Sequence, residues 1–226
     1  MNKTMAVRNR ERSILIQAPF LGADEAITAK FMEAATIVTM PPRHILFREG
    51  EAAQHLYCVL NGYVRLYRLS RDGREADVRI CGPGDTFNEC LIFGADTYQH
   101  NAQAAETCTL ARFDLERIRT MIEEEPKIVK ALLYSMSNSL RATMDCLATD
   151  RLQTAPQRVA SYLIAQGPGG ANSYSLRLPF QKSVLAGKLG LAPEALSRAF
   201  SSLRDAGVIV RGRIIQVNDV SALKHF

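Results

Sequence analysis

The sequence lacks several features that would assign it to common classes of protein. No apolar run approaches the roughly 18 residues that a membrane span requires. The basic residues near the start precede only the apolar run Ile14–Ile16, which is too short for a signal peptide. The five cysteines are scattered and form no C-x-x-C pair, so neither a zinc ribbon nor a disulfide framework is indicated. These absences predict a cytoplasmic protein without a membrane partner.

Motifs of the common enzyme classes are also missing. The sequence contains no glycine-rich phosphate loop, no H-E-x-x-H zinc motif and no G-x-S-x-G nucleophile elbow. The run Glu123–Glu125 offers neighbouring carboxylates, but a run of this kind is almost always solvated or marks a helix start. We therefore predict that the chain is not an enzyme.

Basic residues are concentrated in the last third of the chain. Residues 151–226 hold 10 Lys and Arg against 3 Asp and Glu, whereas residues 1–150 hold 18 against 20. A basic segment is typical of proteins that bind the phosphates of nucleic acids. A merely solvated basic surface is the weaker explanation, because the excess coincides with the motif that follows.

Two short helices joined by a tight turn are predicted within this basic segment. Apolar spacing indicates one helix that ends near Leu189, Gly190 breaks it, and Pro193 opens a second helix that runs to Leu203. This arrangement is typical of a helix-turn-helix, whose second helix enters the major groove of DNA. The polar face of that second helix carries Glu194, Ser197, Arg198 and Ser201.

The segments around this motif complete a small domain. A helix is predicted from Pro156 to about Gln166 and a strand over Tyr174–Leu178. After the motif, Val208–Val210 and Ile214–Val217 flank Arg211–Arg213, which predicts a hairpin with a basic tip. Such a hairpin is a wing, and its arginines are expected to reach phosphate.

The first half of the chain has a different texture. Residues 1–18 show no pattern, and apolar spacing over Asp24–Ala35 predicts a short helix. From Ile37 to Phe113, glycine-bearing turns at intervals of about ten residues predict an all-β sandwich or barrel. Within it, Tyr63–Leu69 is predicted to form a hairpin with Ala76–Ile80.

The segment from Asp114 to about Ala148 is predicted to be helical, with the acidic run Glu123–Glu125 and Pro126 marking the start of its long helix. Its apolar positions recur at spacings of three and four, which leaves two interpretations: packing on its own β domain, or a parallel seam between two copies of the chain. We favour the seam, because helix-turn-helix proteins usually read two half-sites. A polar linker over Thr149–Ala155 is predicted to act as a hinge. The seam residues are Val129, Leu132, Leu133, Met136, Leu140, Thr143 and Leu147.

The order of these elements is similar to that of a known family. Phe47–Glu51, Leu56–Gly62, Val64–Leu66 and Pro83–Glu89 look like the double-stranded β-roll of cyclic-nucleotide-binding domains. From about residue 20 to 226 the chain resembles the CRP/FNR family of bacterial transcription regulators. The resemblance implies an α+β fold with a β-roll sensor domain (1–118), a dimerisation helix and hinge (119–150) and a winged helix-turn-helix (151–226). It also implies a homodimer that binds palindromic double-stranded DNA and contacts RNA polymerase.

The resemblance assigns the base-reading positions to Glu194, Ser197 and Arg198. Glu194 can accept from a cytosine amino group, and Arg198 can contact guanine O6 and N7 together. The pattern resembles FNR-type readers of TTGA-like half-sites. Two departures are Ala192, which cannot cap the second helix, and Pro193, where cyclic-AMP regulators carry an additional Arg. The residues assigned to phosphate are Lys182, Lys188, Ser201, Arg204, Arg211 and Arg213.

The sequence lacks the residues that bind two of the effectors known in this family. Cyclic-AMP members anchor the cyclic phosphate with an Arg-Ser pair, but Thr97–Ala102 contains no Arg, so cyclic AMP is not expected. Oxygen-sensing members need an N-terminal cysteine cluster for an iron–sulfur centre, but the first cysteine here is Cys58, so an iron–sulfur cluster is not expected. The region Leu185–Arg198 looks most like the nitric-oxide-responsive denitrification regulators, which are thought to sense through haem. The expected effector pocket contains Glu89, Tyr98, His100 and Asn101.

The same resemblance indicates which residues would ligate haem iron. His100 is the first choice, because it falls near the position of the missing phosphate anchor, and His55 and His44 are alternatives. Thiolate ligation by Cys90 or Cys58 is also open, whereas His225 in the tail is the weakest choice. A surface or core role is more common for any single histidine. A different small effector in the same pocket, or no effector, is the other interpretation.

Overall fold

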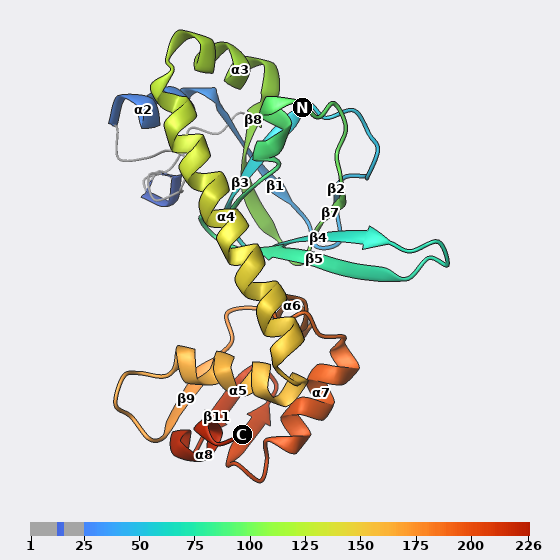
Figure 1. Cartoon of the computed structure of the whole chain (residues 1–226), viewed down its shortest axis with the longest axis vertical. Helices are drawn as coiled ribbons and strands as arrows, with labels where there is room; N and C mark the ends of the chain where they lie inside the picture. Colours follow the sequence, from blue (N-terminus) through green and yellow to red (C-terminus); the bar gives the residue numbers. More distant parts are fainter. Residues whose placement is uncertain (1–12, 16–24) are drawn as a thin grey trace. The chain divides into compact units, whose positions relative to one another are not determined.

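The computed structural model describes residues 13–15 and 25–226 (Figure 1). The chain divides into two compact units, Met1–Ala142 and Thr143–Phe226. Of the patternless segment 1–18, only Ser13–Leu15 lie among the described residues, and these three are helical. No helix in the described ranges is long and apolar enough to cross a membrane.

Two four-stranded antiparallel sheets form most of the first unit. One has the strand order β1-β8-β3-β6 and the other β2-β7-β4-β5. The predicted helix is α2 (Glu25–Ala34), and the predicted hairpin is β4 with β5. The all-β prediction for this segment is therefore confirmed. The strands are β1 (Ala35–Met40), β2 (Ile45–Phe47), β3 (His55–Asn61), β4 (Val64–Leu69), β5 (Glu75–Cys81), β6 (Thr86–Phe87), β7 (Asn101–Ala104) and β8 (Cys108–Asp114).

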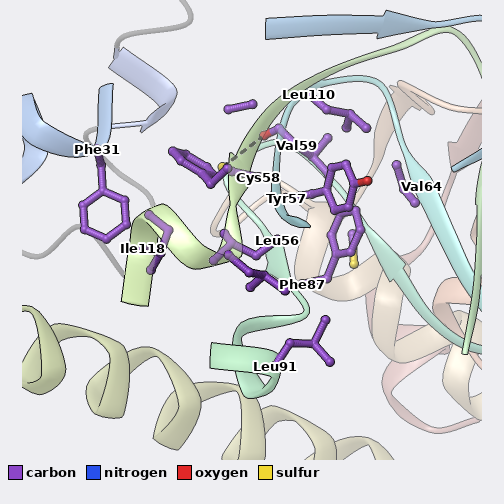
Figure 2. Packing of buried hydrophobic residues seen from close by; sticks show 14 of the residues in the cluster. Phe31, Leu56, Tyr57, Cys58, Val59, Val64, Phe87, Leu91, Leu110 and Ile118 are labelled. Carbon is purple, nitrogen blue, oxygen red and sulfur yellow. Dashed lines mark hydrogen bonds between the residues drawn. The ribbon is translucent and has the colours of Figure 1, made fainter. Parts of the chain in front are cut away.

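The core of this unit combines strand and helix side chains (Figure 2). Strand β3 is buried along five consecutive residues, which shows that both of its faces are covered. Phe31 of α2 meets Phe113 of β8 edge to face, with ring centroids 5.9 Å apart. Ile118 of α3 (Leu115–Glu124) is fully buried in the same cluster. A short 3-10 helix, η1 (Glu89–Phe93), follows β6.

The long helix is α4 (Lys127–Leu152), and two of its faces differ in burial. Ile128, Leu132 and Ser135 follow each other at spacings of four and three and are buried in the first unit. The assignment of Leu132 to a dimer seam is therefore wrong, because this side chain packs on its own unit. The other predicted seam residues are partly or fully exposed, among them Leu133, Leu140 and Leu147.

The predicted linker over Thr149–Ala155 is shorter in the structure. Helix α4 continues to Leu152, and α5 (Ala155–Gln166) begins two residues later, so only Gln153 and Thr154 interrupt the helices. The polar residues before the break contain no glycine or proline and are compatible with an exposed helix, which explains why α4 continues. At the start of α5, the side chain of Gln157 accepts from the backbone N–H of Thr154 at 2.9 Å.

The second unit is a helix-turn-helix with a wing. Helices α5, α6 (Lys182–Lys188) and α7 (Pro193–Ser202) surround a buried apolar core, and a three-stranded sheet of order β10-β11-β9 completes it. The α+β fold class and its order of parts are thus as predicted. The remaining elements are β9 (Tyr174–Arg177), β10 (Val208–Arg211), β11 (Ile214–Val217) and α8 (Val220–Lys224).

Candidate nucleic-acid interface and ligand pocket

Helix α7 presents its polar face to solvent. Leu196, Ala199 and Phe200 are buried on one side of the helix, whereas Glu194, Ser197 and Arg198 are exposed on the other. Gly190 in the preceding turn has φ +61, a conformation that side chains with a Cβ rarely adopt. Ala192 occupies the N-cap position without a side-chain cap, as predicted. The three predicted base-reading residues therefore share one accessible surface.

Two serines of α7 bond back to their own helix. Ser201 Oγ donates to the carbonyl oxygen of Ser197 at 3.1 Å, and Ser202 Oγ donates to that of Arg198 at 3.2 Å. A phosphate oxygen can only accept a hydrogen bond, and a serine hydroxyl has a single hydrogen to donate. Contact between Ser201 and phosphate therefore requires this side chain to rotate away from Ser197.

A groove of about 520 Å³ lies between the start of α6, helix α7 and strand β10. Its walls bring together predicted residues from three separate segments of the chain, and its floor is apolar, with Leu196, Phe200 and Val208 among the lining residues. None of the described residues that line the groove is acidic. A groove that is lined by cations and by no carboxylate attracts the negatively charged phosphate backbone of a nucleic acid. The predicted residues lining it are Lys182, Ser197, Ser201, Arg204 and Arg211.

The other two predicted phosphate residues lie outside this groove. Lys188 ends α6, with its Nζ 5.8 Å from the centre of the Phe180 ring. Arg213 is exposed at the tip of the wing, and its backbone carbonyl accepts from the N–H of Leu178 at 2.8 Å. The structure thus places most of the predicted phosphate residues at one groove, and the other two are exposed outside it.

The wing holds a further cation that the sequence did not single out. In the sheet register, Arg211 faces Ile214 across one strand pair and Arg177 faces Ile214 across the other. Residues directly opposite each other in an antiparallel sheet point to the same face. All three are exposed, so Arg177 and Arg211 form a basic row on the open face of the wing. Only the pairing of β9 with β11 reveals this row.

In the first unit, three of the four predicted pocket residues lie along one run of chain before and within β7. The ring of Tyr98 stacks on that of Phe47, with centroids 3.8 Å apart. Its hydroxyl oxygen accepts from the backbone N–H groups of His55 at 3.2 Å and Gln54 at 3.3 Å. Tyr98 is buried, so its ring and its hydroxyl group are both fixed by neighbours.

His100 is the pocket residue with an unused nitrogen. Its ring lies 5.9 Å from that of Phe47, and its Nε2 is buried without a hydrogen-bond partner among the described residues. Burial lowers the pKa of His100 below its ordinary value of 6.5. Arg68 and Arg79 lower this pKa further, whereas Glu49 raises it. The imidazole is therefore neutral at neutral pH.

Those two arginines lie outside the stretch in which a phosphate anchor is expected. Thr97–Ala102 contains no Arg, but Arg68 of β4 and Arg79 of β5 come close enough to His100 to influence its charge. Arg68 donates from Nη2 to the carbonyl oxygen of Gln99 at 2.8 Å. Strand pairing therefore brings positive charge near His100 from outside Thr97–Ala102, a stretch that itself contains no Arg.

The remaining pocket residues have partners within the fold. The buried Asn101 accepts from the N–H of Glu49 at 3.2 Å and donates to the carbonyl oxygen of Tyr67 at 3.3 Å, so its amide holds the chain together. Glu89 is buried and accepts a hydrogen bond from Thr86 Oγ1. The adjacent Asn88 has φ 75, and its buried Nδ2 has no partner among the described residues.

The alternative haem ligands are spread over the first unit. His55 is half-buried at the start of β3, and burial lowers its pKa. His44 is exposed beside Ala104, at the opposite end of β7 from His100. Burial raises the pKa of the Cys58 thiol well above its usual range, and Cys90 is exposed on η1. In the described part of the chain, no three His, Cys, Asp or Glu side chains gather as a metal site.

Comparison with known proteins assigns both units. Residues 37–125 match the model of the cyclic nucleotide-binding domain, and residues 157–226 match that of the Crp-like helix-turn-helix domain. The chain is 28% identical to a CRP-like cAMP-activated global transcriptional regulator of Mycobacterium tuberculosis, over 90% of this chain and 93% of that protein. It is 29% identical to the nitrogen fixation regulation protein FixK of Azorhizobium caulinodans, over 79% and 74%.

The chain belongs to the CRP/FNR family. It is also similar to the solved structure of DNR from Pseudomonas aeruginosa, with 28% identity, a TM-score of 0.53 and coverage of 97% and 99% of the two chains. This CRP/FNR protein is a DNA-binding transcription regulator and not an enzyme, as predicted. Helix α7 is the second helix of this matched helix-turn-helix domain.

Proposed function

We propose that this regulator binds, as a homodimer, a palindrome with TTGA-like half-sites. The observation that carries this proposal is the exposed row Glu194, Ser197 and Arg198, which stands beside a groove lined by three cations and by no described carboxylate. A guanidinium that meets guanine and a carboxylate that meets cytosine give opposite base preferences, so the row can distinguish the two strands of a half-site.

The phosphate contacts in this proposal come from the groove and the wing. Lys182, Arg204 and Arg211 line the groove, and Arg177 extends the basic row across the wing sheet. None of these four forms an ion pair with another described residue, so their charges remain available to phosphate. Contact with RNA polymerase is part of the same proposal and follows from the regulator's family.

The homodimer is supported by the exposed apolar stripe of α4. Leu133, Leu140, Met144 and Leu147 are each at least half exposed and repeat at spacings of seven, four and three. An apolar stripe of this kind is stabilised when a second helix covers it. A parallel pair of α4 helices would bring two recognition helices to one palindrome.

For the signal, we propose nitric oxide sensed through haem in the first unit, where the imidazole of His100 would hold the iron. The Nε2 of His100, which is buried and has no partner in the described part of the chain, and its neutral imidazole fit the donor that haem iron requires. Bound haem would supply the iron that captures nitric oxide. The residues of the chain set the environment of His100: the Phe47 ring lies 5.9 Å from its own ring, and burial, with Arg68 and Arg79 in addition, lowers its pKa and keeps it unprotonated.

A different small effector is the second candidate, and a specific observation favours it. The buried Nδ2 of Asn88 has no hydrogen-bond partner among the described residues, and Arg79 influences the charge of His100 and is influenced by Glu89. Unpartnered donors beside a cation would bind a small polar anion. Cyclic AMP is therefore included as a comparison ligand, although its usual anchor is missing from Thr97–Ala102.

One experiment tests the output and the input together. Fluorescence anisotropy measures binding to a TTGA palindrome and to a duplex with one half-site scrambled, at fixed salt, with haem, with haem and nitric oxide, with cyclic AMP, or with no addition. We expect the palindrome to be preferred and nitric oxide to change its affinity only when haem is present. Equal binding to both duplexes contradicts the palindrome, and a response to cyclic AMP alone contradicts the haem proposal.

Spectroscopy tests the ligand assignment separately. Protein reconstituted with haem should show a Soret band that shifts with nitric oxide and that changes in His100→Ala. The matched control is His44→Ala, which alters an exposed histidine at the other end of β7. A His100→Ala spectrum identical to that of the unaltered protein removes His100 from the proposal, whatever the DNA experiment shows.

A further inference from the structure

The side chain of Arg158 on α5 is almost enclosed, with 14% of its surface exposed. Its guanidinium donates to the end of α4 in two ways, from Nη1 to Asp150 Oδ1 at 2.5 Å and from Nη2 to the carbonyl oxygen of Asp150 at 3.2 Å. Its Nε donates to the carbonyl oxygen of Gln153 at 3.3 Å. One side chain thus spans the interruption between α4 and α5.

The same guanidinium also reaches the turn that precedes α7. Its Nη1 donates to the carbonyl oxygens of Leu189 at 3.0 Å and Gly190 at 3.4 Å. A Cβ placed on Gly190 would lie 3.0 Å from Asp150 Oδ1 and 3.3 Å from Arg158 Nη1, so the close approach depends on glycine. All of these residues belong to the unit Thr143–Phe226.

The positively charged guanidinium of Arg158 binds acceptors within the protein itself. Arg158 does not line the cationic groove, and its guanidinium is occupied by a carboxylate and four backbone carbonyls. Charge-assisted bonds from a planar guanidinium fix direction as well as distance. Removal of the Asp150 carboxylate would leave the nearly enclosed Arg158 charge without its charged partner. Its place in the structure is therefore that of a tie between segments rather than a surface for DNA.

We propose that Arg158 is a positioning residue for sequence reading: it fixes the turn before α7 to the last turn of α4. The orientation of Glu194, Ser197 and Arg198 then depends on a side chain that touches neither base nor phosphate. The proposal takes α7 as the reading helix and in that respect rests on the proposed function. It does not depend on the TTGA half-site or on the identity of the signal.

The test compares specific and non-specific DNA binding. The specific duplex is selected by the unaltered protein from a random pool, so failure of the TTGA assignment does not affect the result. We expect Arg158→Ala to bind this duplex at least tenfold more weakly, while its affinity for an unrelated duplex changes by less than about twofold and the salt slope of both is unchanged. Arg158→Lys, which keeps the charge but not the fork, should lie in between.

Three further variants make the result decisive. Arg204→Ala, which removes a groove cation, should weaken both duplexes and reduce the salt slope by about 0.9 per protomer. Asp150→Asn removes the charged partner but leaves the four carbonyl acceptors of Arg158, and it should also reduce specificity. Arg151→Ala alters the exposed neighbour of Asp150 and should leave specificity unchanged.

Thermal unfolding of each variant shows which outcomes count. If Arg158→Ala is unfolded at the assay temperature, Arg158→Lys and Asp150→Asn decide: reduced specificity in folded protein supports the proposal, and an unchanged ratio overturns it. An equal loss on both duplexes with a smaller salt slope would make Arg158 a phosphate contact and also overturn the proposal. If the unaltered protein selects no sequence at all, the reading role of α7 fails, and the proposal fails with it.

Discussion

Arg177 and Arg211 stand on the same face of the wing, each directly opposite Ile214. Both side chains are exposed, and Arg177 comes from a strand that precedes the helix-turn-helix in the chain. Two cations on one open sheet face are spaced across neighbouring strands, roughly 10 Å apart over two strand spacings. This spacing suits phosphates along one backbone better than a single phosphate group.

The row predicts the salt dependence of DNA binding. Arg177→Ala and Arg211→Ala should each reduce the slope of log affinity against log salt by about 0.9 per protomer, because each removes one phosphate contact. Both should weaken binding equally on specific and unrelated duplexes. Lys224→Ala removes an exposed charge on α8 as a control and should leave the slope unchanged. A slope unaltered by Arg177→Ala would show that β9 does not face phosphate.

Arg198 should behave differently from these cations. If the guanidinium contacts guanine, Arg198→Ala should weaken binding to the preferred duplex by about 1–3 kcal/mol. The variant should also accept other bases at the position of that guanine. Affinities for a set of duplexes, each with one base pair changed, measure this preference. A uniform loss across the set, like that expected for Arg177→Ala, would make Arg198 a phosphate contact.

Replacement of a leucine by alanine should have different effects on the two faces of α4. Leu140→Ala removes an exposed side chain and should weaken the dimer, by about 1.5–3 kcal/mol for each covered leucine, with little effect on monomer stability. Leu132→Ala opens a cavity in the first unit and should lower the free energy of unfolding by about 2–5 kcal/mol.

Sedimentation and denaturant unfolding separate these two effects. Ala142→Glu places a charge on an exposed position opposite Leu140 around the helix and is the control for the seam. Leu140→Glu, which places a charge on the stripe itself, should weaken the dimer, whereas Ala142→Glu should not. If the two variants dimerise equally well, the seam does not run along this stripe.

The lowered pKa of His100 predicts a pH dependence of stability. In the unfolded chain this histidine binds a proton near pH 6.5, whereas the folded protein resists protonation until a lower pH. The free energy of unfolding should therefore fall as pH is lowered through about 6.5, and it gains nothing above that value. His100→Gln should reduce this slope, which denaturant unfolding at a series of pH values measures. His55 contributes in the same direction.

Most of the helices and strands can be predicted from local patterns in the sequence. Turn glycines and apolar spacing predict the strands, the helix-turn-helix and the wing, because each depends on neighbours a few residues away. The order β1-β8-β3-β6 does not follow from such patterns, since pairing joins segments far apart in the chain. For the same reason Arg177 and the two arginines beside His100 were missed: their roles arise from cross-strand neighbours.

The long helix shows a second limit of sequence patterns. An apolar position at helical spacing indicates that something covers it, but the spacing is the same for a core and for a partner. Leu132 and Leu140 therefore could not be distinguished before the structure placed only one of them in the core. Arg158 gave no signal at all, because its five acceptors come from three different segments.

The packing of Ile128 and Leu132 has a consequence for dilute solutions. Because these side chains hold the first turns of α4 to the first unit, separation of two copies does not require the helix to unravel. In the proposed homodimer, a lone chain would keep the fold of each unit and would lose only its contact with the second half-site. The concentration at which DNA binding fades then reports how tightly two folded chains associate, and unfolding is a separate event.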